Sequence, residues 1–201
     1  VVGLPQKINT KNLNHKDKNK NSILNFLVFG GSQGSIEILA IFENILHSLY
    51  KTSNLKEVFF TVQAPLAKHI EIENLLKKYG YNFKIQNFFY NFDNILEQTD
   101  IALCRSGAGS INDLINYKIP AIICPLPDAK DNHQFENAKM LSSINCAIIV
   151  NRNKINDDEI ISFINKLAND KNFEKNLKDN FNKIEIRNTN ELMWNFIKNE
   201  K

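Results

Sequence analysis

Short apolar segments alternate with amphipathic segments of helical periodicity through most of this 201-residue sequence. Residues 23–29 (ILNFLVF), 101–104 (IALC) and 121–125 (AIICP) have the nearly continuous hydrophobicity of strands that are buried on both faces. Residues 36–50 instead repeat their apolar side chains at helical spacing. Such an alternation is typical of βαβ units, in which helices cover both faces of a parallel sheet. The sequence therefore predicts an α/β fold, a Rossmann-like doubly wound parallel sheet.

The rest of the chain follows the same pattern, apart from its first residues. Further strands are expected at residues 57–62, 82–88 and 146–150, and helices at residues 67–80, 158–170, 173–184 and 191–200 and from near Phe92, Ala108 and Asp131. Residues 1–22 are polar, rich in Lys and Asn and without apolar periodicity. They are interpreted as an interdomain linker, and residues 23–201 as the folded domain.

Composition and charge exclude several classes of function. The formal net charge of +3 is too small to indicate nucleic acid as a partner. No apolar run approaches the roughly 18 residues that a membrane span needs.

Cys104, Cys124 and Cys146 lie in or beside apolar segments, without the spacing of metal ligands. They are interpreted as buried reduced thiols, with a nucleophilic Cys104 as the less favoured alternative, and the sequence indicates no metal and no cofactor.

Ligands of doubly wound sheets bind beyond the carboxyl ends of the strands. The first expected strand runs into FGGSQGS, where Gly30, Gly31 and Gly34 allow close backbone approach and a helix N-terminus can hold phosphate. A purely structural glycine turn is the alternative. The loop is not a Walker motif, and the second strand ends in Gln63 rather than in the acidic residue of a dinucleotide site.

A second polar loop, CRSGAGSINDL, follows the strand at residues 101–104. Its glycines open a helix whose first N–H groups, with the Ser110 hydroxyl, could hold a diphosphate. Asp113 could accept hydrogen bonds from both hydroxyls of a ribose, or could form a capping box with Ser110. Arg105 could steady the loop or contact phosphate.

A third polar loop, KDNHQFENA, follows the apolar run PAIICPLP. Asp131 could be an N-cap with Gln134 reaching back to it, or the polar groups could hold a ligand above the strand end. Three such loops at the carboxyl ends of strands in one sheet favour a nucleotide sugar or another phosphate-bearing ligand.

Together, GGSQGS, CRSGAGSINDL, IPAIICPLP and KDNHQFENA resemble the carboxyl-terminal half of the MurG family of bacterial glycosyltransferases, from about Gly3 to the last helix. That family transfers GlcNAc from UDP-GlcNAc to lipid I and makes lipid II for peptidoglycan. It has a GT-B fold, two Rossmann-like domains with the active site in the cleft between them. The resemblance implies that residues 23–201 are the UDP-GlcNAc-binding domain, the C-terminal domain of a GT-B glycosyltransferase.

The resemblance also implies roles for individual residues, and it places no catalytic residue in this half. The implied UDP-GlcNAc contacts are Ser32 with the diphosphate, Gly109 and Ser110 with phosphate, Asp113 with the ribose, the Phe89 backbone with uracil, and His133 and Gln134 with the sugar hydroxyls. Looser matches are Lys7, Gly31, Arg105, Ala108 and Asn137. The sequence departs from the family where Asp113 replaces the usual Glu, Ser110 replaces a Thr, and GLP replaces a Gly-Asn-Pro hinge.

In the family, the acceptor site, the general base and the membrane-facing patch belong to an amino-terminal domain that this sequence does not contain. The resemblance thus implies that lipid I and the membrane are contacted through that other half, at the cytoplasmic face of the bacterial plasma membrane. The isolated chain is expected to bind donor weakly and to transfer nothing. A split glycosyltransferase, a UDP-GlcNAc 2-epimerase and a relic that binds nothing are the alternatives.

Overall fold

The sheet has six parallel strands in the order β3-β2-β1-β4-β5-β6. The computed structural model describes residues 23–31, 34–52, 57–126, 133–150, 156–184 and 198. The strands are β1 (Leu24–Phe29), β2 (Val58–Gln63), β3 (Asn82–Gln86), β4 (Ile101–Cys104), β5 (Ala121–Ile123) and β6 (Ala147–Ile149). All six lie where the apolar segments predicted them, and the predicted α/β doubly wound fold is confirmed.

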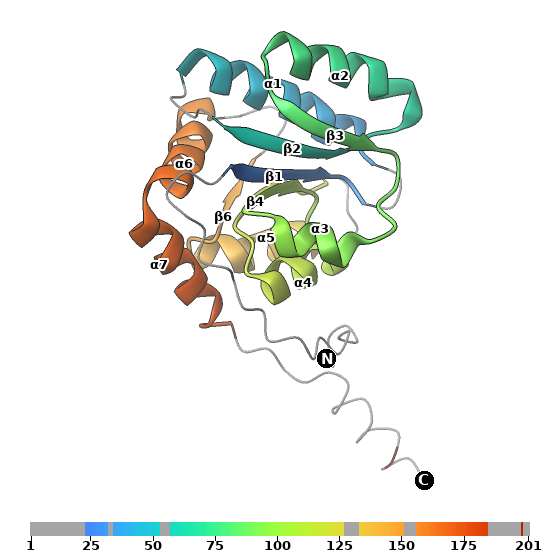
Figure 1. Ribbon diagram of the computed structural model, residues 1–201. Helices are drawn as coiled ribbons and strands as arrows, with labels where there is room; N and C mark the ends of the chain where they lie inside the picture. The colour runs from blue at the N-terminus through green and yellow to red at the C-terminus, as the bar shows by residue number, and fades with distance from the viewer. Residues whose placement is uncertain are drawn as a thin grey trace.

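The strand order creates a switch point at the centre of the sheet. From β1 the chain moves outward through β2 and β3, then returns to β4 on the other side of β1 and moves outward again through β5 and β6. At this point Phe29 and Cys104, the last residues of β1 and β4, are register partners. The helices that follow these two strands, α1 (Ile36–Thr52) and α4 (Ala108–Tyr117), lie on opposite sides of the sheet (Figure 1), and doubly wound sheets bind ligands beside such a switch point.

Helices cover both faces of this sheet. They are α1 (Ile36–Thr52), α2 (His69–Lys78), α3 (Phe92–Gln98), α4 (Ala108–Tyr117), α5 (His133–Ser143), α6 (Asp157–Asn169) and α7 (Lys171–Phe181), with a 3₁₀ turn η1 (Leu66–Lys68) before α2. Figure 1 shows α1 and α2 on one side of the sheet and α3, α4 and α5 on the other. Helix α6 packs against α1, and α7 packs against α6. The linker predicted at residues 1–22 and, apart from Lys198, the helix predicted at residues 191–200 lie outside the described residues.

The core is built mainly from strands β1, β2, β4 and β5 and the helices over them. Every residue of β4 is buried, as its continuous apolar sequence predicted. Phe60 on β2 lies 5.4 Å from Phe26 on β1 and 5.2 Å from Phe42 on α1, measured between ring centroids. This aromatic cluster packs α1 onto the sheet.

The three cysteines are free thiols buried in this core. Burial raises the pKa of the Cys104 thiol far above its usual value, and the nearby Asp113 carboxylate raises it further. The predicted burial of the three cysteines is confirmed, and this burial disfavours the alternative of a nucleophilic Cys104.

Candidate functional site

The segments that leave the carboxyl ends of the strands meet along one edge of the sheet, called here the carboxyl edge. Their described residues are 30–31 and 34–35 after β1, 64–65 after β2, 87–91 after β3, 105–107 after β4 and 124–126 after β5. Every predicted site residue that is described lies in one of these segments or in the first two turns of the helix that follows it. Ser32 and Lys7 lie outside the described residues, so their predicted donor contacts stay predictions.

The turn after β1 is held by its glycines. A Cβ atom on Gly30 would lie 2.5 Å from both the Cβ and the backbone nitrogen of Ser35, which is closer than real Cβ atoms approach. Gly31 and Gly34 have φ angles of +96° and +76°, in the region that favours glycine. The Ser35 hydroxyl accepts a hydrogen bond from Ile38 N at 3.4 Å and so caps α1. These constraints explain the glycines from backbone geometry alone.

The turn after β4 opens helix α4 without such constraints. Gly107 is the N-cap, with φ −58° and ψ 147°, and no side chain caps the helix. The alternative of a capping box between Ser110 and Asp113 is excluded, because α4 begins at Ala108 and Ser110 already lies in its first turn. The first N–H groups, from Ala108 to Ser110, stand at the positive end of the helix dipole. Ser110 and Asp113 are three residues apart and therefore lie on one side of α4.

Arg105 joins three of these segments. Its guanidinium donates hydrogen bonds to the carbonyl oxygens of Cys124 at 3.2 Å and Pro125 at 3.4 Å, both beyond β5. It also donates to the Ser35 hydroxyl at 3.3 Å and forms an ion pair with Glu37 on α1. The side chain is 8% exposed, and this burial lowers the pKa of the guanidinium from its usual value. Arg105 therefore steadies the edge, while its predicted phosphate contact stays a prediction.

The start of α5 is fastened to the same edge. The Gln134 side-chain oxygen accepts hydrogen bonds from Leu126 N at 3.0 Å and from the Ser106 hydroxyl at 3.5 Å. Asn137 donates to the Ser106 carbonyl oxygen at 3.0 Å. Since the oxygen of Gln134 is engaged, its NH₂ group is the part available to a ligand, and no described residue accepts from it. His133, the first residue of α5, is exposed, whereas the capping proposed for Asp131 falls outside the described residues.

Phe89 lies in the segment after β3, with its side chain in the core. It is 7% exposed, and its ring stacks on Phe92 at a centroid distance of 5.7 Å. The flanking Phe88 and Tyr90 are exposed and contact each other edge to face. The buried ring anchors this segment, an arrangement compatible with the predicted backbone contact to a base.

The sequence pattern did not predict that Gln63 belongs to this edge. Its side-chain oxygen accepts a hydrogen bond from Gly30 N at 3.2 Å, and its NH₂ group donates to the Asn87 carbonyl oxygen at 3.5 Å. The only signal in the sequence is an amide at the end of a mostly apolar strand.

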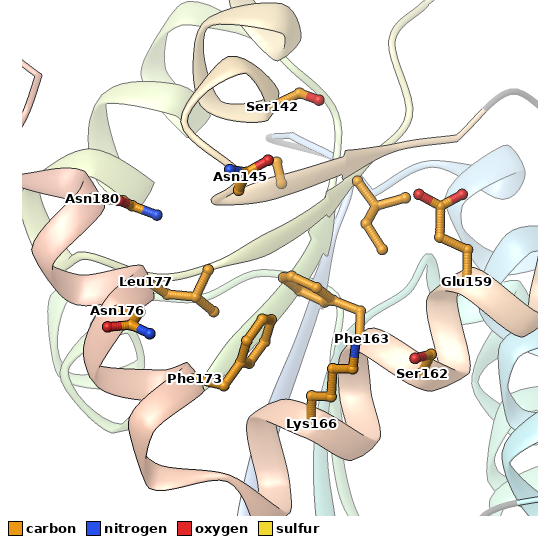
Figure 2. Close-up of a pocket in the computed structure, with 12 residues that line it drawn as sticks. Ser142, Asn145, Glu159, Ser162, Phe163, Lys166, Phe173, Asn176, Leu177 and Asn180 are labelled. Atoms are coloured by element: carbon orange, nitrogen blue, oxygen red, sulfur yellow. The ribbon is translucent and has the colours of Figure 1, made fainter.

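The cavity drawn in Figure 2 lies elsewhere, between the end of α5, β6, α6 and α7. Its volume is about 520 Å³, and Phe163 and Phe173 point into it, 5.7 Å apart between ring centroids. Asn145 and Ala147 place it at the amino-terminal end of β6, and no predicted site residue lines it.

Among the residues that the structure describes, no cluster of three His, Cys, Asp or Glu side chains could hold a metal ion. The same part of the chain contains no helix of the length and apolar character that a membrane span requires.

Comparison with known families and sequences identifies related proteins. The family described as "Glycosyltransferase family 28 C-terminal domain" matches residues 25–192. Two relatives share the name UDP-N-acetylglucosamine--N-acetylmuramyl-(pentapeptide) pyrophosphoryl-undecaprenol N-acetylglucosamine transferase. The one from Rickettsia bellii is 32% identical over 85% of this chain and 47% of its own length. The one from Prochlorococcus marinus is 39% identical over 64% of this chain and 34% of its own length. The chain spans about half the length of the first of these relatives, and about a third of the second.

Solved structures support the fold. MurG from Acinetobacter baumannii superposes with a TM-score of 0.70 at 21% identity, over 86% of this chain and 49% of that one. The glycotransferase of kitacinnamycin superposes with a TM-score of 0.61 at 16% identity, over 90% of this chain and 43% of that one. At these identities the likeness establishes the C-terminal domain fold of GT-B glycosyltransferases.

Proposed function

The chain belongs to the glycosyltransferase family 28 C-terminal domain family, and on that premise we propose that it binds UDP-GlcNAc at its carboxyl edge as the donor half of a lipid II-forming glycosyltransferase. One observation carries the proposal: the described residues that are predicted to contact the donor lie along one edge of the sheet, beside the switch point between β1 and β4. The MurG-type names of the relatives favour UDP-GlcNAc over other nucleotide sugars.

Each part of the donor has a counterpart along this edge. The backbone at Phe89 contacts uracil, and the Asp113 carboxylate accepts hydrogen bonds from the ribose. The first turn of α4, with Gly109 and Ser110, and the turn after β1 hold the diphosphate, because free N–H groups at a helix N-terminus favour anions. His133 and the NH₂ group of Gln134 reach the hydroxyls of GlcNAc.

The same residues serve the reaction by stabilising the leaving group. Negative charge grows on UDP as the sugar departs, and the N-terminal end of α4 offers it fixed N–H donors and a positive dipole end. The base that deprotonates the acceptor, the lipid I site and the contact with the inner face of the plasma membrane belong to the other half. We therefore expect the 201-residue chain alone to bind donor weakly and to form no lipid II.

Calorimetric titration of the chain with UDP-GlcNAc tests the proposal, with UDP-glucose and ADP as controls. We expect UDP-GlcNAc to bind most tightly and Asp113→Ala to weaken it about tenfold or more, since a charge-assisted hydrogen bond contributes about 1.5–3 kcal/mol. Asp158→Ala removes an exposed carboxylate from the first turn of α6 and serves as the matched control, with unchanged affinity.

Failure to bind UDP-GlcNAc by a folded chain contradicts the donor-binding proposal. Equal affinity for UDP-GlcNAc and ADP contradicts the uridine preference. Lipid II formation by the isolated chain contradicts the assignment of the acceptor site and base to another half.

A further inference from the structure

Gln63 connects two segments of the carboxyl edge through its side chain. It is the last residue of β2, which pairs with β1 on one side and with β3 on the other. Its amide bridges the Gly30 N–H in the turn after β1 and the Asn87 carbonyl oxygen in the segment after β3. These backbone groups lie immediately beside Gly31 and close to Phe89.

The Gln63 side-chain amide is buried, which costs free energy unless it is hydrogen-bonded. Gln63 is 4% exposed, and the residues on either side of it, Val62 and Ala64, are apolar and fully buried. An apolar side chain would fill this place without the cost of removing an amide from water. Burying the amide is tolerated because both of its ends are hydrogen-bonded, and replacing it would leave two backbone groups without these partners.

We propose that Gln63 is a positioning residue that sets the spacing between the diphosphate-binding turn and the base-reading segment. This inference rests on the proposed function, which gives the turn at Gly30 and Gly31 to the diphosphate and the Phe89 backbone to uracil. Gln63 touches neither group of the donor. It acts through the two backbone segments that do, so that both are preorganised for one ligand.

A spacer of this kind has a specific consequence for binding. Uridine alone uses the segment after β3 and Asp113 on α4, and inorganic pyrophosphate alone uses the turn after β1 and the start of α4, so neither fragment engages both segments that Gln63 bridges. UDP must engage both at once, so it gains affinity from their fixed separation, as any ligand does when two contacts are held at the matching distance. Loss of the bridge should therefore weaken UDP more than it weakens either fragment.

Titration of the full chain with UDP, uridine and pyrophosphate, followed by NMR of the backbone amides, tests the proposal in Gln63→Met. Methionine keeps the length of the side chain and forms neither hydrogen bond. We expect UDP to bind about tenfold more weakly, with less than about a threefold change for each fragment. In the wild-type chain, uridine alone should also shift the Gly30 amide resonance, and Gln63→Met should abolish that shift.

His69→Gln is the matched control. The His69 ring hydrogen-bonds the Ala64 carbonyl oxygen at 2.8 Å on the same edge, but this bond joins no two donor-binding segments. It should leave the ratio of UDP to fragment affinities unchanged.

Equal losses for UDP and both fragments in Gln63→Met would overturn the positioning role, since they would mean general damage. A Gly30 resonance that uridine leaves unmoved in the wild-type chain would overturn it as well, even if Gln63→Met fails to fold. A wild-type chain that does not bind UDP contradicts the proposed function itself and removes the positioning role with it.

Discussion

The two glycine turns of the carboxyl edge look alike in sequence and differ in structure. After β1, Gly30 admits no Cβ atom beside Ser35, and Gly31 has a positive φ angle. After β4, Gly107 has an ordinary backbone conformation, and a Cβ atom on Gly109 would meet nothing within 4 Å. The fold itself requires glycine in the first turn and does not require it in the second.

Because of this difference, the two turns are unequal evidence for ligand binding. GGSQGS resembles a phosphate loop, yet its first two glycines are explained by the backbone, so they are weak evidence of binding. In CRSGAGS no close contact requires Gly107 or Gly109, and this turn opens a helix whose first N–H groups would stabilise an anion. The second turn is therefore the stronger argument for a phosphate-bearing ligand, and substitutions in the two turns should behave differently.

The largest effect is expected for Gly30→Ala. The added methyl group would lie 2.5 Å from Ser35 backbone nitrogen, which cannot move without displacing the start of α1. Forcing atoms into packed regions costs about 1–3 kcal/mol, and a contact with backbone belongs at the upper end, about 3 kcal/mol. Urea unfolding measures the free energy of unfolding directly. A loss below about 1 kcal/mol would show that the turn adapts and that this glycine is not required.

A somewhat smaller loss is expected for Arg105→Leu, which cuts the side chain that joins the two turns. Leucine removes the hydrogen bonds to the Cys124 and Pro125 carbonyl oxygens and the ion pair with Glu37. Because Glu37 is 33% exposed and can be hydrated, the cost should be about 2 kcal/mol rather than that of a fully buried pair. The check is again urea unfolding.

Lys77→Met is the control for Arg105→Leu, since Lys77 pairs with Glu73 on the surface of α2. Its loss should cost less than about 0.5 kcal/mol. Equal effects of the two substitutions would contradict a structural role for Arg105.

These contacts mark the limit of what the sequence predicts here. Strands such as β1 and β4 were predictable because parallel strands buried on both faces are nearly continuously apolar, whereas the partly exposed edge strand β3 has only the alternating pattern of NFKIQ. The start of α4 near Ala108 was predicted as well, but its cap was not, since an N-cap glycine carries no side-chain signal and Ser110 with Asp113 imitates a capping box.

Polar contacts across the edge could not be predicted at all. Gln63 bonds to Gly30, 33 residues away, and Gln134 bonds to Ser106, 28 residues away. A buried amide that ties two loops and one that holds a ligand look the same in a sequence, because their partners are set by tertiary structure.

A smaller loss separates Gly31→Ala from Gly30→Ala within the first turn. No atom lies within 4 Å of a Cβ on Gly31, so only its φ of +96° opposes the substitution. Backbone strain of this kind costs about 1–2 kcal/mol, and alanine recovers part of it by restricting the unfolded chain. A net loss of about 1 kcal/mol in urea unfolding is expected, and a loss equal to that of Gly30→Ala would mean that Gly31 is crowded as well.

The smallest effect, and one of opposite sign, is expected for Gly109→Ala. This position lies in the first turn of α4, has open space at its Cβ and a helical backbone, so alanine should stabilise the chain by about 0.5 kcal/mol. If the backbone N–H of residue 109 is what holds phosphate, alanine keeps this N–H group, and the UDP affinity in calorimetry should change less than about twofold. A tenfold loss of UDP affinity in a chain of unchanged stability would instead show that UDP occupies the space beside Gly109. The ligand would then require the absence of a side chain rather than the backbone N–H group.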